Sequence, residues 1–166
     1  LFDDALAMEL GASIHGAVSD VFASADGIKK SISSPGPGNY ITIAKAVGAA
    51  RSIVGDAMIR EHSFMQAHGS STPQNRVTES LILDKVAQAF GIDNWPITAV
   101  KAYLGHSIGT ASGDQLINTL GVLSNEILPG IPTIDKVADD VYADRLNIST
   151  TDLGLNGRAE IGFLNS

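Results

Sequence analysis

Two short polar stretches hold residues whose types and spacing could support catalysis. The first reads HGSSTP over residues 68–73, with Glu79 after it, and the second reads KAYLGHSIG over residues 101–109. Histidine is the commonest general acid or base in enzymes, and an adjacent glycine lets a substrate or backbone approach closely. A single histidine after a strand is more often a structural hydrogen-bonding residue. Two of the four histidines, His68 and His106, stand in equivalent stretches, which favours a catalytic site.

The elements that carry these stretches alternate between strand and helix. Each stretch follows a short apolar run and precedes apolar residues at helical spacing. This alternation predicts a layered α/β sheet, in which functional groups gather at the strand-to-helix turns. The expected elements are a strand over 63–67, a polar loop over 68–75, a helix that Thr78 precedes and Gly91 closes, a strand over 97–103, a glycine-rich turn over 104–113 and a helix over 114–125.

Simpler patterns flank this central region. Near alternation of small and β-branched residues over 7–25 predicts an extended strand broken by glycines. Two prolines and two glycines predict a loop over 33–39, and helical spacing predicts an amphipathic helix over 40–58. The remaining expectations are a loop with a short helix over 129–148, a last strand over 159–164, and packing of Trp95 at the start of a strand.

The composition limits the size and location of the protein. With 166 residues and 44% hydrophobic content, the chain is long enough for one domain with a single core. No apolar run approaches the roughly 18 residues of a membrane span, and the start has no signal-peptide pattern, so we expect a cytoplasmic protein. The chain starts without Met and stops directly after an apolar run, so we expect a chain truncated at both ends.

Charge and cysteine content exclude several kinds of site. The formal net charge is −7, from 18 acidic and 11 basic residues without a basic run, so nucleic acid is not an expected partner. The chain has no cysteine, which excludes disulfides, cysteine metal ligands and a cysteine nucleophile of its own. No metal site is predicted. Two groups of residues are not predicted to be functional. Asp139, Asp140 and Asp144 are interpreted as a solvated face, and His15 and His62 as surface or structural histidines.

The two polar stretches resemble motifs of the β-ketoacyl synthase family of condensing enzymes. The C-terminal half of that family carries an HGTxTP segment and then a KxxxGHxxGxxG segment, and Lys101 and His106 have the internal spacing of the second one. Glu79 falls where the family has a glutamate after the first motif. The resemblance covers nearly the whole chain and is strongest over 64–113. Residues 157–166 resemble the final strand that leads into a glycine-rich loop with a phenylalanine gate.

The resemblance implies a fold and a reaction. The fold would be α/β, the thiolase-like αβαβα layered fold, with residues 1–166 as one domain that forms its C-terminal half. The reaction would be a decarboxylative Claisen condensation, in which a carbanion made from a malonyl thioester attacks an acyl group held on a cysteine. His68 and His106 would donate N–H bonds to the thioester oxygen that gains charge. Lys101 and Glu79 would support His68 as an ion pair or hydrogen-bond relay.

The resemblance also implies partners. Ser70 and Thr72 would contact the substrate, a malonyl thioester carried by an acyl carrier protein. The nucleophilic cysteine would come from the N-terminal half of the same synthase, and the intact acyltransferase would be a homodimer without cofactor or metal. The chain alone is expected to be inactive and to expose apolar surface where the N-terminal half would pack. Fatty-acid and polyketide synthesis both stay open as the pathway.

Departures and alternatives complete the interpretation. Ser70 replaces a threonine of the family but keeps a hydroxyl, whereas Arg76 stands where many members have aspartate, so the charge network there must differ.

GHSIG also fits the nucleophile elbow of α/β-hydrolases, but all four histidines precede Ser107, and those enzymes place histidine after the serine. Thiolases share the fold and a GHPxG segment, but would lack HGSSTP and the lysine. A non-condensing homologue of the chain-length-factor type stays open.

Overall fold

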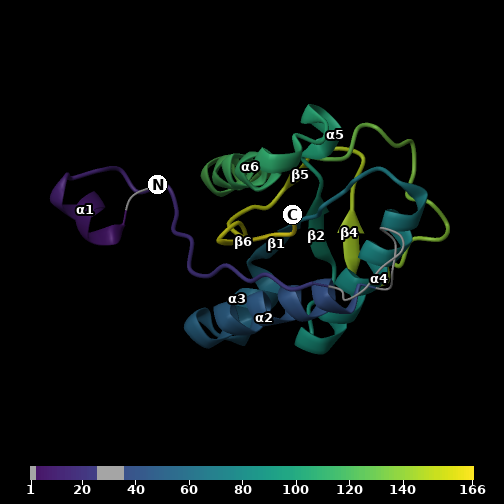
Figure 1. Ribbon diagram of the computed structural model, residues 1–166, viewed down its shortest axis with the longest axis horizontal. Coiled ribbons are helices and arrows are strands. Elements are labelled where there is room, and N and C mark those ends of the chain that lie inside the picture. The colour runs from purple at the N-terminus through teal and green to yellow at the C-terminus, as the bar shows by residue number, and fades with distance from the viewer. Residues whose placement is uncertain (1–2, 26–35) are drawn as a thin grey trace.

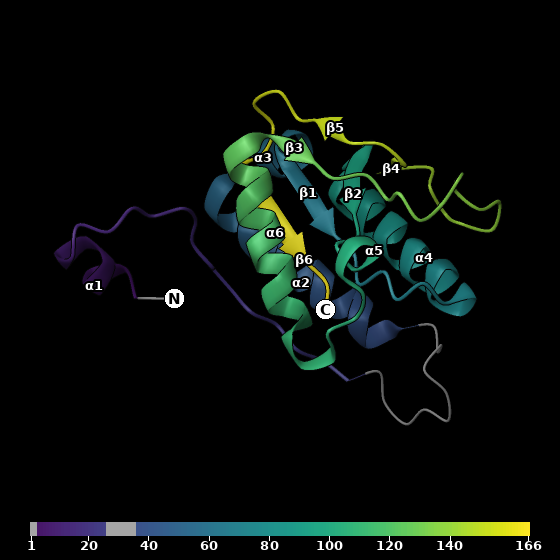
Figure 2. The ribbon, with the colours of Figure 1, turned by 90° about the horizontal axis from the view of Figure 1, so that it is seen from above.

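The computed structural model describes residues 3–25 and 36–166, which form a layered α/β fold around one parallel sheet. The strands lie in the order β4 (Leu146–Ile148), β2 (Trp95–Thr98), β1 (Ser63–Gln66) and β6 (Ile161–Leu164). Helices α2 (Pro37–Val54), α3 (Asp56–Glu61) and α4 (Pro73–Phe90) cover one face, and α5 (Lys101–Leu104) and α6 (Ala111–Asn125) lie on the other (Figure 1, Figure 2). The predicted α/β layering is confirmed.

The short remaining elements lie at the margins. A two-stranded antiparallel sheet pairs β3 (Ile127–Leu128) with β5 (Leu153–Gly154). The 3-10 turn η1 (Ile108–Thr110) leads directly into α6, and α1 (Asp4–Glu9) lies apart from the sheet (Figure 1). No helix in the described ranges has both the length and the apolar character that a membrane span requires.

Apolar side chains fill both faces of the sheet. Trp95 is fully buried between the sheet and α2, α3 and α4, and its indole N–H donates to Ser63 Oγ at 3.0 Å. A smaller cluster that includes Phe64 and Val122 lies between the sheet and α6. Because each large apolar residue meets side chains from another element, the two faces hold the strand ends in fixed positions. Trp95 is the first residue of β2, as the sequence predicted.

Parallel pairing places the ends of β1 and β2 at one edge of the sheet. Met65 pairs with Ile97 and Gln66 pairs with Thr98, so the two strands end side by side. The segments that follow them therefore leave the sheet together, and these segments contain His68 and Lys101. This edge of a parallel sheet is where such folds assemble their sites.

Helix α4 begins and ends at clear chemical signals. Thr72 is its N-cap and accepts a hydrogen bond from Asn75 N at 3.3 Å, Pro73 occupies the first turn, and Gly91 closes the helix with φ of 65°. The predicted helix was therefore correct in type and at its C-terminal end. It starts earlier than expected, at the proline rather than after Thr78.

Two predictions in the first forty residues are wrong. Over 7–25 the chain forms the end of α1 and then an exposed extended segment without ladder hydrogen bonds, because no described strand lies beside it. A β-branched pattern expresses only a preference, and a strand also needs a partner. Of the predicted loop over 33–39, the part from Pro37 belongs to α2, since proline is well suited to a first helical turn. Residues 33–35 lie outside the described ranges.

Three further boundaries needed correction. The helix predicted over 40–58 is confirmed, but Gly55, with φ of 87°, separates it into α2 and α3. The strand predicted over 97–103 stops at Thr98, and Lys101 begins α5, because the neighbouring strands end there, β4 opposite Ile97 and β1 opposite Thr98. The short helix expected within 129–148 is absent from that described segment, whose backbone instead bonds to side chains of α4, as in Tyr142 N to Ser80 Oγ at 3.1 Å.

Candidate active site

The turn after β1 holds His68 close against the end of β2. Gly69 has φ of 57°, and a Cβ there would lie 2.7 Å from the Ala99 Cβ, so both the backbone conformation and the space favour glycine. Ala67 N donates to Thr98 O at 2.8 Å and extends the strand pairing up to the turn. His68 is thus half-buried and fixed at the sheet edge.

Glu79 on α4 binds the backbone of this turn. Its buried carboxylate accepts hydrogen bonds from the backbone N–H groups of His68 at 2.6 Å and Gly69 at 2.9 Å. Asn75 Nδ2 donates to the same carboxylate at 2.9 Å, and Asn165 Nδ2 donates at 2.8 Å. Four donors offset the cost of burying the charge, and they fix the carboxylate relative to the turn.

Lys101 also binds the backbone of this turn. Its ammonium donates to the His68 carbonyl oxygen at 2.8 Å and lies 3.5 Å from His68 Nδ1. Burial lowers the pKa of Lys101, while the negative charges of Glu79 and Asp114 oppose that shift. Lys101 does not bind Glu79 directly. Of the two predicted arrangements, an ion pair and a hydrogen-bond relay, the geometry therefore favours the relay, which runs through the His68 turn.

The electrostatics keep the His68 ring neutral. Burial lowers its pKa most, the positive charge of Lys101 and nearby His106 lower it further, and Glu79 opposes them. The adjacent ammonium faces Nδ1, which favours the tautomer with the proton on Nε2. At neutral pH, His68 can therefore donate one N–H bond from Nε2.

His106 reaches the same place from the loop between α5 and η1. The Ile108 N–H donates to His106 Nδ1 at 3.0 Å, which assigns the proton of the neutral ring to Nε2. Ile108 has φ of 58°, an unusual conformation for a β-branched residue. The ring centroids of His68 and His106 are 5.2 Å apart with planes at 81°. The two rings thus lie edge to face, each with Nδ1 facing a donor, which leaves Nε2 of each ring as the nitrogen that can donate.

The hydroxyl residues of the first stretch lie on the same turn. Ser70 Oγ is 3.3 Å from Thr72 Oγ1, and Thr72 also caps α4. A hollow of about 340 Å³ adjoins the second histidine segment; its lining comprises Val100, Tyr103, Leu104, Asp114, Ile117, Asn118 and Pro129. The hydroxyl pair thus provides polar contacts on the His68 turn, and the hollow provides a largely apolar surface beside α5 and α6.

The serine of GHSIG is not arranged as a nucleophile. Ser107 Oγ donates to the Asp114 carboxylate, and His106 Nδ1 is already engaged by a backbone N–H. A hydrolase elbow requires the serine hydroxyl beside a histidine base. The arrangement around Ser107 therefore gives the hydrolase interpretation no support.

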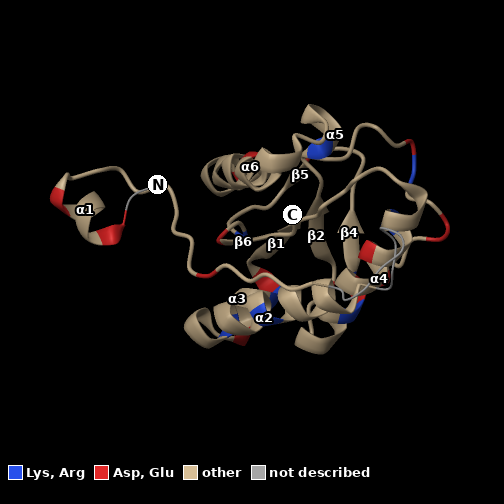
Figure 3. Ribbon diagram, in the orientation of Figure 1, with Lys and Arg blue, Asp and Glu red and all other residues tan. Residues whose placement is uncertain are grey.

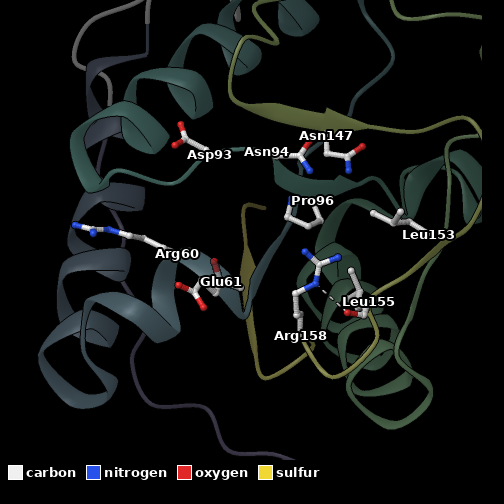
Figure 4. A pocket seen from close by; sticks show the side chains of 10 residues that line it. Arg60, Glu61, Asp93, Asn94, Pro96, Asn147, Leu153, Leu155 and Arg158 are labelled. Carbon is white, nitrogen blue, oxygen red and sulfur yellow. Dashed lines mark hydrogen bonds between the residues drawn. The ribbon is translucent and has the colours of Figure 1, made fainter.

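A second hollow, of about 420 Å³, lies away from the histidines. It is lined by residues that precede β1 and β2, such as Arg60 and Asp93, so it lies at the opposite edge of the sheet (Figure 4). Arg158 and Glu61 also line it, and its charges of both signs largely compensate one another. Among the described residues, no group of three or more potential ligands converges as a metal site would.

Several residues at the site were not predicted from the sequence. Asn75 and Asn165 bind Glu79, and Gln115 Nε2 donates to Ala67 O at 3.0 Å and Asn165 O at 2.8 Å. Asn75 stands four residues before Glu79 on one helix, a spacing that could have revealed the pair. Gln115 interrupts the apolar inner face of α6, which was the available signal for it.

The acidic residues after β3 are only partly a solvated face. Asp140 forms a two-bond ion pair with Arg76, at 2.9 Å from Nε and 2.8 Å from Nη2. The guanidinium lowers the pKa of Asp140 through these hydrogen bonds. Arg76 thus pairs with Asp140, whereas the charged residues next to the histidines include Glu79, Lys101 and Asp114.

Comparisons with known proteins identify the family of the chain. The family described as beta-ketoacyl synthase, C-terminal domain, matches residues 15–135. The chain is 65% identical, over its whole length, to 26% of the beta-ketoacyl-[acyl-carrier-protein] synthase FabY of Pseudomonas aeruginosa. It is 34% identical over 87 residues to the 3-oxoacyl-[acyl-carrier-protein] synthase 1 of Escherichia coli, covering 52% of this chain and 20% of that protein.

Solved structures show the same fold. The crystal structure of the P. aeruginosa ketosynthase FabY matches with a TM-score of 0.95 over 99% of this chain and 26% of that one. The ishigamide ketosynthase/chain length factor matches with a TM-score of 0.68 at 24% identity, over 91% of this chain and 35% of that one, and supports the fold alone. The chain therefore spans about a quarter of the length of its 65%-identical relative.

Proposed function

Because the chain belongs to the β-ketoacyl synthases, as part of their C-terminal domain, we propose that it is the histidine-bearing half of an enzyme that condenses an acyl thioester with a malonyl thioester. The observation that carries this proposal is the pair of imidazoles whose ring centroids are 5.2 Å apart and whose Nδ1 atoms both face donors, so that Nε2 of each ring is left to donate. Residues 1–166 would form one domain of that longer enzyme.

The two imidazoles would act in the decarboxylation step. When the malonyl thioester loses carbon dioxide, the electron pair of the broken C–C bond moves into an enolate, and negative charge builds on the thioester oxygen. Nε2–H bonds from His68 and His106 would stabilise that oxygen. Removing one such donor typically costs about 3 kcal/mol of transition-state stabilisation. The carbanion would then attack an acyl group on a cysteine outside this chain, which has none.

Lys101 and Glu79 would position His68, and Lys101 would keep it neutral. The ammonium and the carboxylate bind the backbone of the same turn, through the His68 carbonyl and the His68 N–H. The positive charge of Lys101 also opposes protonation of the imidazole. A protonated ring would donate as well, but it would lose the acceptor at Nδ1 that faces the ammonium. Ser70 and Thr72 would contact the thioester or its carrier arm.

The exposed face of α6 would be covered by the N-terminal part of the same synthase. Ile117 of α6 and the neighbouring Leu104 of α5 are exposed there, at 69% and 64%. Asp114 is the charged residue of α6, which is otherwise drawn without charge in Figure 3. An apolar, nearly uncharged surface of this kind fits a permanent protein contact. The intact enzyme would be a cytoplasmic homodimer.

The remaining partners follow from the reaction. An acyl carrier protein would deliver the malonyl group, and it would dock on surface outside this chain, whose net charge is −7. We place the enzyme in fatty-acid synthesis, with polyketide synthesis as the alternative. A non-condensing homologue of the chain-length-factor type remains a second candidate, but the arranged pair of Nε2–H donors favours catalysis.

Decarboxylation of malonyl-acyl carrier protein by the intact synthase tests the proposal. We expect His68→Ala and His106→Ala each to lower the rate by a hundredfold or more, or about 3 kcal/mol. His15→Ala, a change at an exposed histidine of the extended segment, is the matched control and should leave the rate unchanged. An active wild type that tolerates both site changes would overturn the oxyanion role, and an inactive wild type would support the non-condensing alternative.

A further inference from the structure

Gln115 joins the two histidine segments through a single side-chain amide. The residue is fully buried on the inner face of α6. Its Nε2 donates to the Ala67 carbonyl at 3.0 Å and to the Asn165 carbonyl at 2.8 Å. One nitrogen therefore bridges the ends of two neighbouring strands, β1 and β6.

Both acceptor carbonyls belong to the His68 side of the site. Ala67 immediately precedes His68, and the Asn165 side chain donates to Glu79 at 2.8 Å, which in turn binds the His68 N–H. Asn165 N also donates to Gln66 O at 3.0 Å, which continues the pairing of β6 with β1. A shift of Gln115 would therefore displace the His68 turn both through Ala67 and through Asn165 with Glu79.

The donor belongs to the His106 side. Helix α6 starts directly after η1, which follows His106, and Ser107 is bonded to Asp114 next to Gln115. The loop with His106 and the amide of Gln115 thus move with the first turns of the same helix.

We propose that Gln115 is a positioning residue that sets the separation of His68 and His106, and through it the geometry of the oxyanion site. This inference rests on the proposed decarboxylation. Among uncharged side chains, a primary amide fits the role, because two carbonyl acceptors require two N–H donors from one atom. A carboxylate would place negative charge against two carbonyl oxygens, and an apolar side chain would leave both without this donor.

The matched pair of variants is Gln115→Met and Thr119→Val in the intact synthase. Thr119 is buried one helical turn further along the same face, and its hydroxyl has no hydrogen-bond partner among the described residues. For Gln115→Met we expect kcat for malonyl decarboxylation to fall by about a hundredfold, the effect typical of a 1 Å misplacement, with little change in KM. Thr119→Val should keep wild-type kcat. Equal kcat losses in both variants, or none in Gln115→Met, would overturn the inference.

A pH profile of Gln115→Glu separates positioning from simple loss of stability. Burial beside two carbonyls raises the pKa of the introduced carboxyl. Its protonated form donates one O–H bond, whereas its ionised form donates none. The rate of this variant relative to wild type should therefore rise as pH falls from about 8 to 6. A ratio that is constant across this range contradicts the inference, since general destabilisation would not follow the protonation of one carboxyl.

A crystal structure of Gln115→Met distinguishes failure of this inference from failure of the proposed function. If the wild-type synthase does not decarboxylate, the proposed function fails, but the ring separation can still be measured. A change of about 1 Å or more in the 5.2 Å distance between the ring centroids supports positioning by Gln115. An unchanged distance overturns it, whatever the enzyme does.

Discussion

The turn that carries His68 and the loop that carries His106 are stabilised in different ways. The His68 turn is half-buried and is bound by Glu79, by Lys101 and, through Ala67, by Gln115. The His106 loop is exposed, and its ring is held by a single backbone N–H from Ile108. One imidazole is thus fixed by buried contacts of this chain, whereas the other lies on an exposed loop beside the apolar face that we propose the partner half covers.

This difference predicts which substitutions lower stability as well as activity. Substitutions around His68 should disturb both stability and activity, because buried polar groups there would lose their partners. Substitutions around His106 should act more on local geometry, because the loop has few contacts to lose. The three experiments below test that contrast in order of expected effect.

The largest effect is expected for Glu79→Gln. All four partners of the carboxylate are donors, so an amide would turn its own NH2 group toward donors and leave at least two of them unpaired. We expect the free energy of unfolding of the intact synthase, measured in urea, to fall by about 3 kcal/mol. Decarboxylation should fall with it, since the His68 turn loses its anchor.

Glu61→Gln is the control for that change. Glu61 is an exposed carboxylate on α3, so its replacement should alter unfolding by less than about 0.5 kcal/mol. If Glu79→Gln were equally mild, the His68 turn would not depend on the carboxylate, and the contrast between the two segments would be broken.

A smaller, pH-dependent effect is expected for Lys101→Met. The ammonium of Lys101 lowers the pKa of His68, so removing it should raise that pKa toward the ordinary value of 6.5. We expect the neutral form of His68 to be the active one, so activity should be lost as the pH falls through the pKa of His68. The acidic limb of the decarboxylation profile should therefore move to higher pH in the variant.

The charge-conserving variant Lys101→Arg separates charge from shape. It keeps the positive charge near His68, so its acidic limb should stay near that of the wild type even if its rate is lower. Equal shifts of the limb in both variants would mean that the position of the ammonium, rather than its charge, controls His68.

Much of the fold was predictable because periodicity reports burial directly. The strand over Ser63–Gln66, the helix that Gly91 closes and the strand over Ile161–Leu164 all carry local signals in their own residues. The strand predicted over 7–25 was wrong because pairing depends on a neighbouring strand, which no local pattern contains. Proline at the start of α2 was misinterpreted as loop, although it suits a first helical turn.

The candidate site shows the same division. His68, Lys101 and His106 stand in compact motifs, and the structure brings them together with Glu79. Asn165 was missed because it reaches Glu79 across the sheet from the far end of the chain. Such contacts follow from the strand order β2-β1-β6, which periodicity does not determine.

The smallest effect is expected for Ile108→Gly. Ile108 has φ of 58° and is 82% exposed, so its side chain strains the backbone without burying itself in the described structure. Glycine relieves about 1–2 kcal/mol of that strain and costs about 0.5–1 kcal/mol of chain entropy, so stability should stay level or rise slightly. The backbone N–H to His106 Nδ1 remains, and decarboxylation should stay within about threefold of wild type, or about 0.7 kcal/mol. Gly109→Ala, which adds a methyl group to open space, is the neighbouring control. A loss of stability above about 1 kcal/mol in Ile108→Gly alone would show that the isoleucine packs against the partner half, so the His106 loop would be completed by that contact.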